Sequence, residues 1–537
     1  MKKMTKKAVS LGLVATMALS MTACNSATGN NSTTTAPETT STETTSTDST
    51  TDVTSSEETT TQQAEIVKPE KIKVMWDGTI FKEGDNYAEA FYNALAEKLG
   101  IEIEWVRPDH SGYADQIGIA FNDKSTLADV VILPSNFYAS YAAQGNLWNM
   151  TDAWNNSEIA NSGRLNSYAD SVINTWLTKG PDGEEGIYGM YPARGGGCVT
   201  YVNKALAEQA GYTEDTLPTT WAEYQEFLAA LKNVTGAAPI LAAGEAPYVN
   251  YLPEFYQDAY PDFYYDETAG AWVDGFTTDA MAAALDRLAW GVSEGYLDAD
   301  IFSNPSTSKV RDKFYEGTST SVFTYWAGTW AQTITDKLAN KGWDEGVWVL
   351  KPIAEVGAYT ERLSPMICIT SACQNPEGVF KYFIDPILDG GEVQTLWQYG
   401  VEGTHYVVGD DGKFVFQLTE SAARDGKSSK TSKNLFETQL KIADFDSAVY
   451  PDGDPGAGTS TTEAARNSFN IFNENSKYAP KMNATDESLE NQSTIWNEKT
   501  RLIAAVAQGQ MTGAEAIAEY QANCGALSQL VLDSFNN

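Results

Sequence analysis

The sequence predicts an α/β fold in which two lobes each hold a mostly parallel sheet flanked by helices. Two observations support this prediction. Short apolar strands alternate with amphipathic helices from residue 71 on, and the same alternation resumes after residue 219. A chain of 537 residues is long enough for two such units, and no repeat of fixed period indicates a propeller or a solenoid.

The first lobe is predicted from five consecutive elements with short connections. Asn86 and Glu89 form the spacing of a capping box, and Gly100 supplies a stop for the helix that they begin. This order favours parallel strands, with a ligand crevice at their carboxyl ends. The expected strands are 72–76, 101–106 and 129–133, and the expected helices are 86–99 and 113–121.

The second lobe is predicted from a similar series. Thr220 and Glu223 form another capping box, and the helix after them carries an apolar face. The apolar run 239–244 is typical of a strand that feeds a glycine turn, and 321–326 is typical of a strand that ends at Ala327-Gly328. Asp410–Gly412 predicts a hairpin turn between two short strands.

The charge of the chain excludes several classes of partner. Against 72 Asp and Glu stand 36 Lys and Arg, a net charge of −36, and such a surface repels a nucleic-acid backbone or an anionic lipid surface. Two histidines and five cysteines lack the spacing of metal ligands, so we predict neither a metal nor a cofactor. The chain is rich in rings, with 14 Trp, 27 Tyr and 20 Phe, and excess rings are suited to the flat faces of sugars.

The first 64 residues predict a signal peptide followed by a lipid-anchored linker. Four lysines precede the apolar run 8–21, which is short for a membrane span and typical of a signal peptide covering 1–23. Ser20–Cys24 resembles a bacterial lipobox, which predicts a palmitoylated lipoprotein anchored through Cys24 on the extracellular face of the cell membrane; an incidental cysteine is the alternative. Residues 24–64 are Ser/Thr-rich and predict a disordered linker.

The other four cysteines leave two possibilities open. Outside the cell an even number of cysteines permits disulfides. Cysteines within apolar runs are more often buried thiols, and the sequence favours this second interpretation. The four are Cys198, Cys368, Cys373 and Cys524.

Several segments resemble the carbohydrate-binding lipoproteins of ABC transporters, which form family 1 of the extracellular solute-binding proteins. Their order and spacing agree with that family from about residue 70 to 520. The segments are Gly186–Pro192, Gly197–Leu206, Ala210-Gly211, Leu217–Glu223, Asn375–Glu377, Tyr399–Tyr406 and Gln510–Ala516.

The resemblance implies a periplasmic-binding-protein-like fold, with hinge crossings and a ligand cleft between two lobes that close on the ligand. It also implies permease subunits as partners, a monomeric protein and no catalytic residues. The expected boundaries place lobe 1 at 65–190 with a return segment at about 360–390. Lobe 2 is expected at 191–359, with a return segment at about 391–537.

Candidate sugar-binding residues are rings and polar side chains at strand ends and glycine turns. A sugar presents hydroxyl groups and C–H faces, so its site needs aromatic platforms beside hydrogen-bonding groups. For any single ring, burial in the core is the competing interpretation, and for His405 a structural hydrogen bond competes with a ligand contact. The candidates are Trp76, Asp77, Asn136, Tyr138, Arg194, Trp326, Trp330, Trp397, Glu402, His405 and Tyr406.

An aromatic stretch from Tyr248 to Tyr265 has two interpretations. It could form the rim of the cleft and lengthen it for an oligosaccharide, or it could be a satellite cluster packed beneath a long loop. The second is slightly favoured.

The function predicted from these features is the capture of a carbohydrate, an oligosaccharide, for an ABC importer. A lipid-anchored glycoside hydrolase is the main alternative, because the many acids permit a pair of carboxylates across a glycosidic bond. A binding protein for peptides or another polar solute is the second. No glycosidase motif is recognised, so the chain is predicted not to be an enzyme.

Overall fold

The computed structural model describes most of the chain from residue 65 on, and residues 65–537 form one compact unit. The predicted signal peptide, Cys24 and the linker lie outside the described residues. Within the described ranges, no helix combines the length and the apolar character needed to cross a membrane. These ranges are 65–77, 86–109, 112–162, 172–191, 195–242, 251–298, 301, 307–317, 320–343, 345–416, 463–480 and 485–536.

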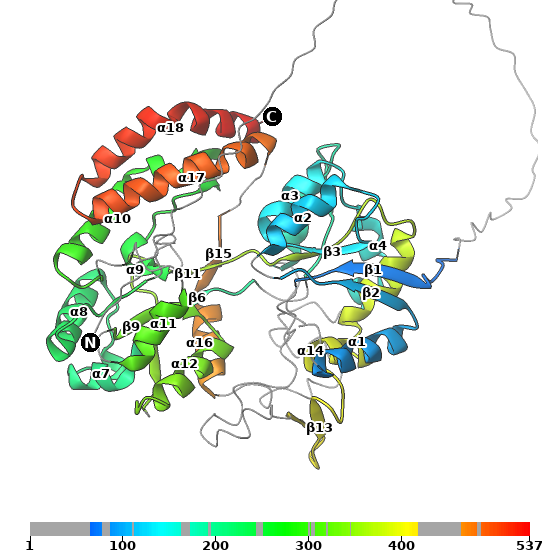
Figure 1. Cartoon of the computed structure of the whole chain (residues 1–537), viewed down its shortest axis with the longest axis horizontal. Helices are drawn as coiled ribbons and strands as arrows, with labels where there is room; N and C mark the ends of the chain where they lie inside the picture. Colours follow the sequence, from blue (N-terminus) through cyan, green and yellow to red (C-terminus); the bar gives the residue numbers. More distant parts are fainter. Residues whose placement is uncertain are drawn as a thin grey trace, which may run out of the picture. The chain divides into compact units, whose positions relative to one another are not determined.

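The first sheet has four strands in the order β12-β3-β1-β2. The strands are β1 (Lys71–Met75), β2 (Glu102–Val106), β3 (Val130–Leu133) and β12 (Met366–Ile369). β1 is parallel to β2 and to β3, whereas β12 is antiparallel to β3. Helices α1 (Asn86–Leu99) and α2 (Tyr113–Asn122) connect the three parallel strands, so the predicted order of the first lobe is confirmed (Figure 1).

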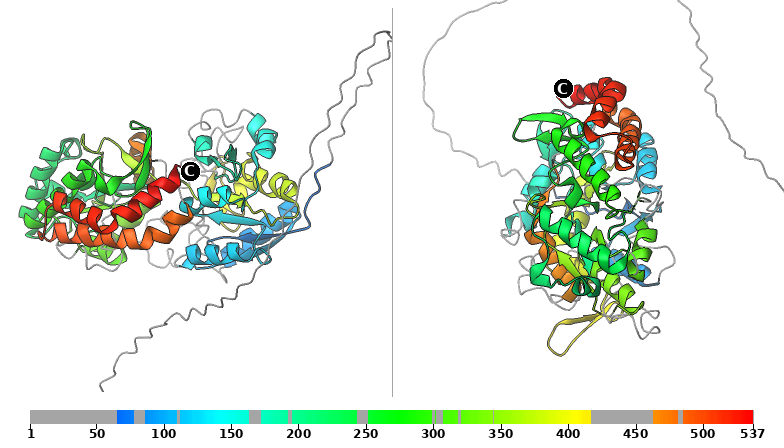
Figure 2. Two further views of the ribbon diagram at one scale, coloured as in Figure 1. Left: turned by 90° about the horizontal axis from the view of Figure 1, so that it is seen from above. Right: turned by 90° about the vertical axis from the view of Figure 1, so that its left-hand side faces the viewer.

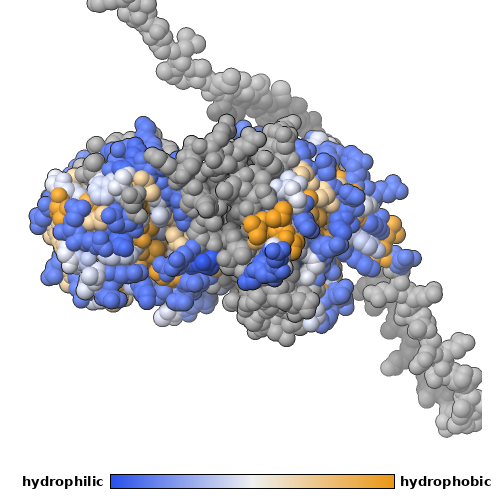
Figure 3. All heavy atoms as spheres, turned by 90° about the horizontal axis from the view of Figure 1, so that it is seen from below, coloured by the Kyte–Doolittle hydropathy of each residue, from blue (hydrophilic) through white to orange (hydrophobic). Residues whose placement is uncertain are grey.

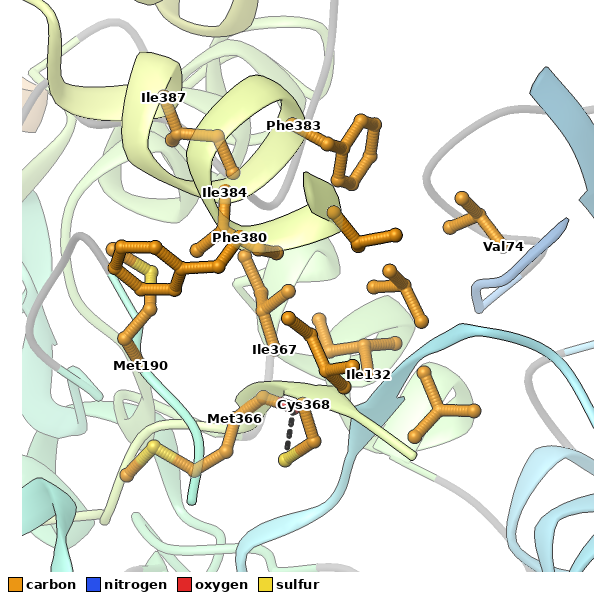
Figure 4. Packing of buried hydrophobic residues seen from close by; sticks show 14 of the residues in the cluster. Val74, Ile132, Met190, Met366, Ile367, Cys368, Phe380, Phe383, Ile384 and Ile387 are labelled. Carbon is orange, nitrogen blue, oxygen red and sulfur yellow. Dashed lines mark hydrogen bonds between the residues drawn. The ribbon is translucent and has the colours of Figure 1, made fainter. Parts of the chain in front are cut away.

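The core of the first lobe forms where apolar residues recur with the expected periods. Phe91, Leu95 and Leu99 lie four residues apart on α1 and are buried, and all four residues of β3 are buried because helices cover both faces of the sheet. Figure 4 shows Ile132 and Ile367, from paired strands, in one cluster with Ile384.

The first lobe receives more of the late chain than we expected. Helix α14 (Glu392–Tyr399) contributes Val393 and Trp397 to the same core cluster as β1 and β3. The segment that packs with the first lobe therefore runs past the boundary expected near residue 390. It begins with β12 and continues through α13 (Pro376–Val379), a π-helical turn (Phe380–Ile384) and a 3-10 turn (Asp385–Leu388).

The second sheet differs from the prediction because it is antiparallel. Its order is β10-β6-β9, and the middle strand β6 (Cys198–Asn203) runs opposite to β9 (Val322–Trp326) and to β10 (Val347–Leu350). The register pairs Cys198 with Trp326, so β6 starts at the end where β9 finishes. The chain enters this lobe along β6, whereas β9 and β10 run back toward the point of entry. An apolar strand pattern does not indicate whether a strand runs parallel or antiparallel to its neighbours.

Helices surround the second sheet and form the larger part of its core. The capping box at Thr220 and Glu223 is confirmed, and Tyr224, Phe227 and Leu228 of α8 (Trp221–Thr235) are buried. The two long C-terminal helices lie side by side (Figures 1 and 2). The other helices of this part are α7 (Lys204–Gln209), α9 (Pro253–Tyr256), α10 (Asp279–Ser293), α11 (Thr307–Glu316), α12 (Thr329–Ala339), α16 (Glu463–Glu474), α17 (Asp486–Ala507) and α18 (Gly513–Phe535).

Short elements complete the described fold. The predicted strand at 239–244 is reduced to Ile240, which bridges Leu297 and Val322, and its last two residues lie outside the described ranges. The hairpin around Asp410–Gly412 is confirmed as β13 and β14. These elements are α3 (Ser135–Ala143), α4 (Thr151–Asn155), α5 (Glu158–Asn161), β4 (Leu177–Lys179), β5 (Glu185–Ile187), β7 (Phe263–Asp266), β8 (Ala271–Asp274), β11 (Tyr359–Glu361), β13 (Tyr406–Val408), β14 (Phe414–Phe416), β15 (Ser476–Tyr478) and 3-10 turns at Asn174–Trp176, Glu214–Thr216 and Gly275–Thr277.

The cysteines of the body are thiols. Cys198, Cys368, Cys373 and Cys524 are all buried and unpaired, as the apolar sequence around the first two favoured. Burial raises the pKa of Cys198 to about 12, so its thiolate is not available as a nucleophile near neutral pH.

Two chain segments cross between the sheets beside one another. Residues 195–197 lead into β6, and the segment from β11 to Arg362 leads into β12. The Arg362 N–H donates to the Gly196 carbonyl at 3.0 Å. A Cβ atom on Gly195 would lie 1.8 Å from the Arg362 carbonyl oxygen, so the absence of a side chain permits the two crossing segments to touch.

Replacing Gly195 with alanine is expected to lower the free energy of unfolding by about 1–3 kcal/mol, because one crossing segment must move to admit the methyl group. Urea denaturation measures this change. Gly118→Ala in α2 is the matched control, since a Cβ atom there meets nothing within 4 Å. An equal stability for Gly195→Ala and the unchanged chain would show that the two segments are not held in contact.

Candidate ligand-binding site

Trp76 and Trp397 are core residues, and we remove both from the predicted site. Neither side chain is accessible to solvent, and their ring centroids lie 5.6 Å apart. Phe91 meets Trp397 edge-on at 5.1 Å, and Trp105 meets Trp76 edge-on at 6.2 Å. No ring face is left for a sugar, because each is used to pack α1 and α14 on the first sheet.

Tyr138 and His405 are also corrected to structural residues. The hydroxyl of Tyr138 donates to the Trp176 carbonyl at 2.5 Å and accepts from the Tyr188 N–H at 3.0 Å, which ties α3 to the segment after β5. His405 is fully buried, and its Nδ1 accepts from the Val401 N–H at 2.7 Å. The structural hydrogen bond that competed with a ligand role for His405 is therefore present.

The remaining candidates of the first lobe and the hairpin do not gather into one site. Tyr406 is buried against Phe414 at a centroid distance of 4.0 Å, and burial raises its pKa to about 12. Glu402 is exposed beside it, and Asp77 is half-buried at the end of β1. Arg194 and the side chain of Asn136 lie outside the described residues.

Trp326 and Trp330 are placed as the sequence led us to expect, at the carboxyl end of β9. Both rings are half-buried, so part of each surface stays accessible. The Ala327 N–H donates to the Gly197 carbonyl at 2.9 Å, and this bond fixes the strand end beside the crossing segments. Gly328 has φ of 76°, a left-handed value, and its turn brings Trp330 at the start of α12 back toward β9.

Two arginines that sequence reasoning missed pack against these rings. The guanidinium carbon of Arg362 lies 4.2 Å from the centroid of Trp326. That of Arg311 lies 4.7 Å from Trp330 and 5.0 Å from Tyr325, and its Nη1 donates to the Tyr325 hydroxyl at 2.5 Å. Such stacked cations contribute about 0.5–2 kcal/mol each. No local signal marks them, because Arg311 resembles an ordinary helix-surface charge and Arg362 follows a three-residue strand.

Tyr251 joins the two stacks into one aromatic–arginine cluster, which consists of Tyr251, Arg311, Tyr325, Trp326, Trp330 and Arg362. The rings of Tyr251 and Tyr325 are stacked at 6.2 Å. Tyr251 belongs to the aromatic stretch from Tyr248 to Tyr265, for which the sequence left two interpretations open. In the structure, residues of this stretch lie in different places. Phe255 and Tyr256 are fully buried in the core, whereas Tyr251 remains half-buried in the cluster, and Tyr248 lies outside the described residues.

Arg362 is accessible to solvent although protein atoms surround its guanidinium. Its side chain is exposed, yet desolvation by the surrounding protein lowers the pKa of its guanidinium. The cluster presents partly exposed aromatic rings and guanidinium N–H donors, and such groups suit a polar, ring-shaped ligand.

The described residues hold no cluster suited to a metal. Within these ranges, no group of three or more His, Cys, Asp or Glu side chains is arranged to hold a metal ion. The surface around the described elements is mostly hydrophilic on the face shown in Figure 3, with separate hydrophobic areas.

Comparison with known proteins gives a family and a fold. Residues 79–383, more than half of the 537 residues, match the family model described as bacterial extracellular solute-binding protein. A comparison with curated protein sequences found no match.

Solved structures match over most of the chain at low sequence identity. The N-glycan transport solute-binding protein NgtS from Streptococcus pneumoniae is 16% identical, with a TM-score of 0.59, covering 87% of this chain and 97% of that one. An HMO-binding, ABC-transporter-associated solute-binding protein from Bifidobacterium longum infantis has the same identity and coverage, with a TM-score of 0.58. The sugar-binding protein MalE from Xanthomonas citri is 15% identical, with a TM-score of 0.57, covering 87% and 99%. The likeness confirms the predicted two-lobed fold.

Proposed function

Because this chain belongs to the family of bacterial extracellular solute-binding proteins, we propose that it captures an oligosaccharide and delivers it to the permeases of an ABC importer. The observation that carries this proposal is the aromatic–arginine cluster beside the crossing segments. Half-buried Trp326 and Trp330 keep part of their ring surface exposed for sugar rings, and the guanidinium groups over them offer donors for sugar hydroxyls. The HMO-binding and N-glycan transport solute-binding proteins among the similar structures support it.

The ligand is proposed to lie between two lobes that close on it. The crossing segments at Gly195–Gly197 and Tyr359–Arg362 would then form the hinge, and the cluster at the end of β9 would lie next to it. A transporter must distinguish loaded from empty binding protein, and hinge closure supplies two discrete shapes whose populations the ligand shifts.

The proposed location follows from the leader sequence. Cleavage before Cys24 and its palmitoylation would anchor the protein on the outer face of the cell membrane as a lipoprotein, with residues 24–64 as a flexible spacer. The charge of −36 would not hold it there, so the lipid is the proposed membrane contact. We propose that it works as a monomer with its permeases.

A binding role is favoured over hydrolysis by the family to which the chain belongs. Hydrolysis of a glycosidic bond needs two carboxyl groups across the bond, roughly 5–9.5 Å apart. The family that the chain belongs to is one of solute-binding proteins, and the ring and guanidinium contacts of the cluster suit the binding of a sugar. We therefore propose no catalytic residue.

Thermal unfolding of the mature chain tests the function, with Cys24→Ser so that no lipid is attached. A bound oligosaccharide at 100 times its Kd should add about 2.7 kcal/mol to the stability of the folded state. Stabilisation by a glycan that chromatography then finds intact is the expected result. Cleavage of the glycan would indicate that the protein is a glycoside hydrolase. Stabilisation by peptides alone would overturn the proposal that it binds a sugar.

Replacing Trp326 with alanine is expected to weaken binding of the stabilising glycan about 10- to 100-fold, as loss of a buried aromatic anchor does at other binding sites. Isothermal titration calorimetry measures the change. Trp290→Ala is the matched control, because Trp290 is a half-buried ring on α10 that packs against Trp221 at 5.4 Å. If both variants bind the glycan as tightly as the unchanged chain, the site lies elsewhere.

A further inference from the structure

The guanidinium groups of both arginines of the cluster lie over aromatic rings. Trp326 supports one face of Arg362, and Tyr325 and Trp330 both contact Arg311. A guanidinium that is fixed in this way loses little conformational freedom when it binds a ligand, and its edge still presents N–H donors in a planar fork. That fork matches the two oxygens of a carboxylate.

Neither arginine forms an ion pair with an acidic residue in the part of the chain that the structure describes. Other cations do form such pairs: Arg501 contacts both Glu498 and Glu519, and Lys499 contacts Asp274. The groups whose charge acts on the pKa of Arg362 are phenols and a thiol, those of Tyr251, Tyr191 and Cys198. In a chain with twice as many acidic as basic residues, two arginines that form no ion pair among the described residues are conspicuous.

The overall negative charge does not prevent an anion from binding here. At physiological ionic strength the Debye length is about 8 Å, so distant surface carboxylates are largely screened. A charge-assisted bond to a guanidinium acts at contact distance and is roughly twice as strong as a neutral hydrogen bond. The local arginines therefore decide which ligand is preferred, while the net charge mainly slows its approach.

We infer that the ligand is an acidic oligosaccharide, whose sugar rings lie on the aromatic faces of the cluster and whose carboxylate groups bind Arg362 and Arg311. This inference rests on the proposed carbohydrate-binding function and narrows its substrate class. Neutral sugars need donors and acceptors in similar numbers, whereas the cluster supplies an excess of fixed, positively charged donors.

The test compares matched ligands that differ in the carboxyl group alone. Calorimetry with the mature Cys24→Ser chain uses uronic-acid oligosaccharides and the same oligosaccharides with each carboxyl reduced to an alcohol. We expect the acidic form to bind at least 10-fold more tightly, with a preference that falls as salt is raised. Arg362→Gln and Arg311→Gln should each reduce the preference, and Arg362→Lys should restore part of it.

Controls separate binding from folding. Arg501→Gln removes an exposed arginine of α17 that is paired with acids, and it should leave the preference unchanged. Thermal unfolding of each unliganded variant checks its fold. If a variant does not fold, the acidic and reduced ligands can still be compared on the unchanged chain. Equal binding of both forms, or tighter binding of the reduced form, overturns the acidic ligand and leaves carbohydrate binding intact. If no carbohydrate binds, both proposals fail.

Discussion

Replacing Lys499 with methionine is expected to lower the free energy of unfolding by about 3–5 kcal/mol, because it leaves a buried carboxylate without its counter-charge. Lys499 on α17 and Asp274 at the end of β8 are almost fully buried, and Nζ lies 2.8 Å from Oδ1. Nζ also donates to the Pro261 carbonyl at 2.7 Å. Urea denaturation of the variant measures the loss.

Asp274 joins more than one ion pair, which is why the loss should be large. Its carboxylate also accepts from the hydroxyls of Tyr520 at 2.6 Å and Ser528 at 2.7 Å, both on α18, and from the Phe276 N–H at 3.2 Å. One carboxylate thus holds both C-terminal helices on the hairpin β7–β8. Without Lys499 the negative charge of this carboxylate stays buried with hydrogen bonds and no counter-charge from Lys499.

A double variant separates the burial of charge from the loss of packing. Asp274→Asn with Lys499→Met removes both charges, and we expect it to recover a large part of the stability, since neutral replacements of a buried pair are often well tolerated. Lys337→Met on the exposed face of α12 is the control and should change the stability by less than about 0.5 kcal/mol. A double variant no more stable than Lys499→Met would indicate that packing, rather than charge, carries the effect.

Local sequence signals were enough for the elements of the first lobe and not for the direction of the second sheet. Strand periodicity, capping boxes and glycine stops each act within a few residues, and β1, α1, β2, α2 and β3 all formed where those signals predicted. The antiparallel pairing of β6 depends on where the chain enters the lobe. At that entry Gly195 lies against Arg362, which is far away in sequence, so no local pattern reports it.

The site was predicted in part, for a similar reason. A tryptophan after a strand can face a ligand or the core, and Trp326 and Trp76 have the same local pattern. Trp76 is buried because α14, more than 300 residues later, brings Trp397 against it. The arginines were missed because they belong to the cluster only through packing against aromatic rings. Those rings come from other helices and strands, so no local sequence pattern indicates the contact.

Glu254 is expected to make the protein less stable as the pH rises through the range from about 4.5 to 7. It lies on α9 and is 2% exposed, and burial raises the pKa of its carboxyl from 4.5 to about 7. Between these values the unfolded chain releases a proton that the folded chain keeps. The stability that this group contributes below pH 4.5 is thus lost by pH 7, at about 1.4 kcal/mol per pH unit, or about 3 kcal/mol in all.

Glu254→Gln tests this linkage, because glutamine is neutral at every pH and keeps an oxygen for the Thr200 hydroxyl, which donates to Glu254 at 2.7 Å. We expect the variant to match the unchanged chain at pH 4.5 and to be about 3 kcal/mol more stable at pH 8, as measured by urea denaturation at both pH values. Glu226→Gln, at an exposed position of α8, is the control and should show the same small difference at both. A difference for Glu254→Gln that does not change with pH would mean that the carboxyl ionises equally in the folded and unfolded chain, and that Thr200 and its neighbour Thr324, 2.9 Å away, compensate for its burial.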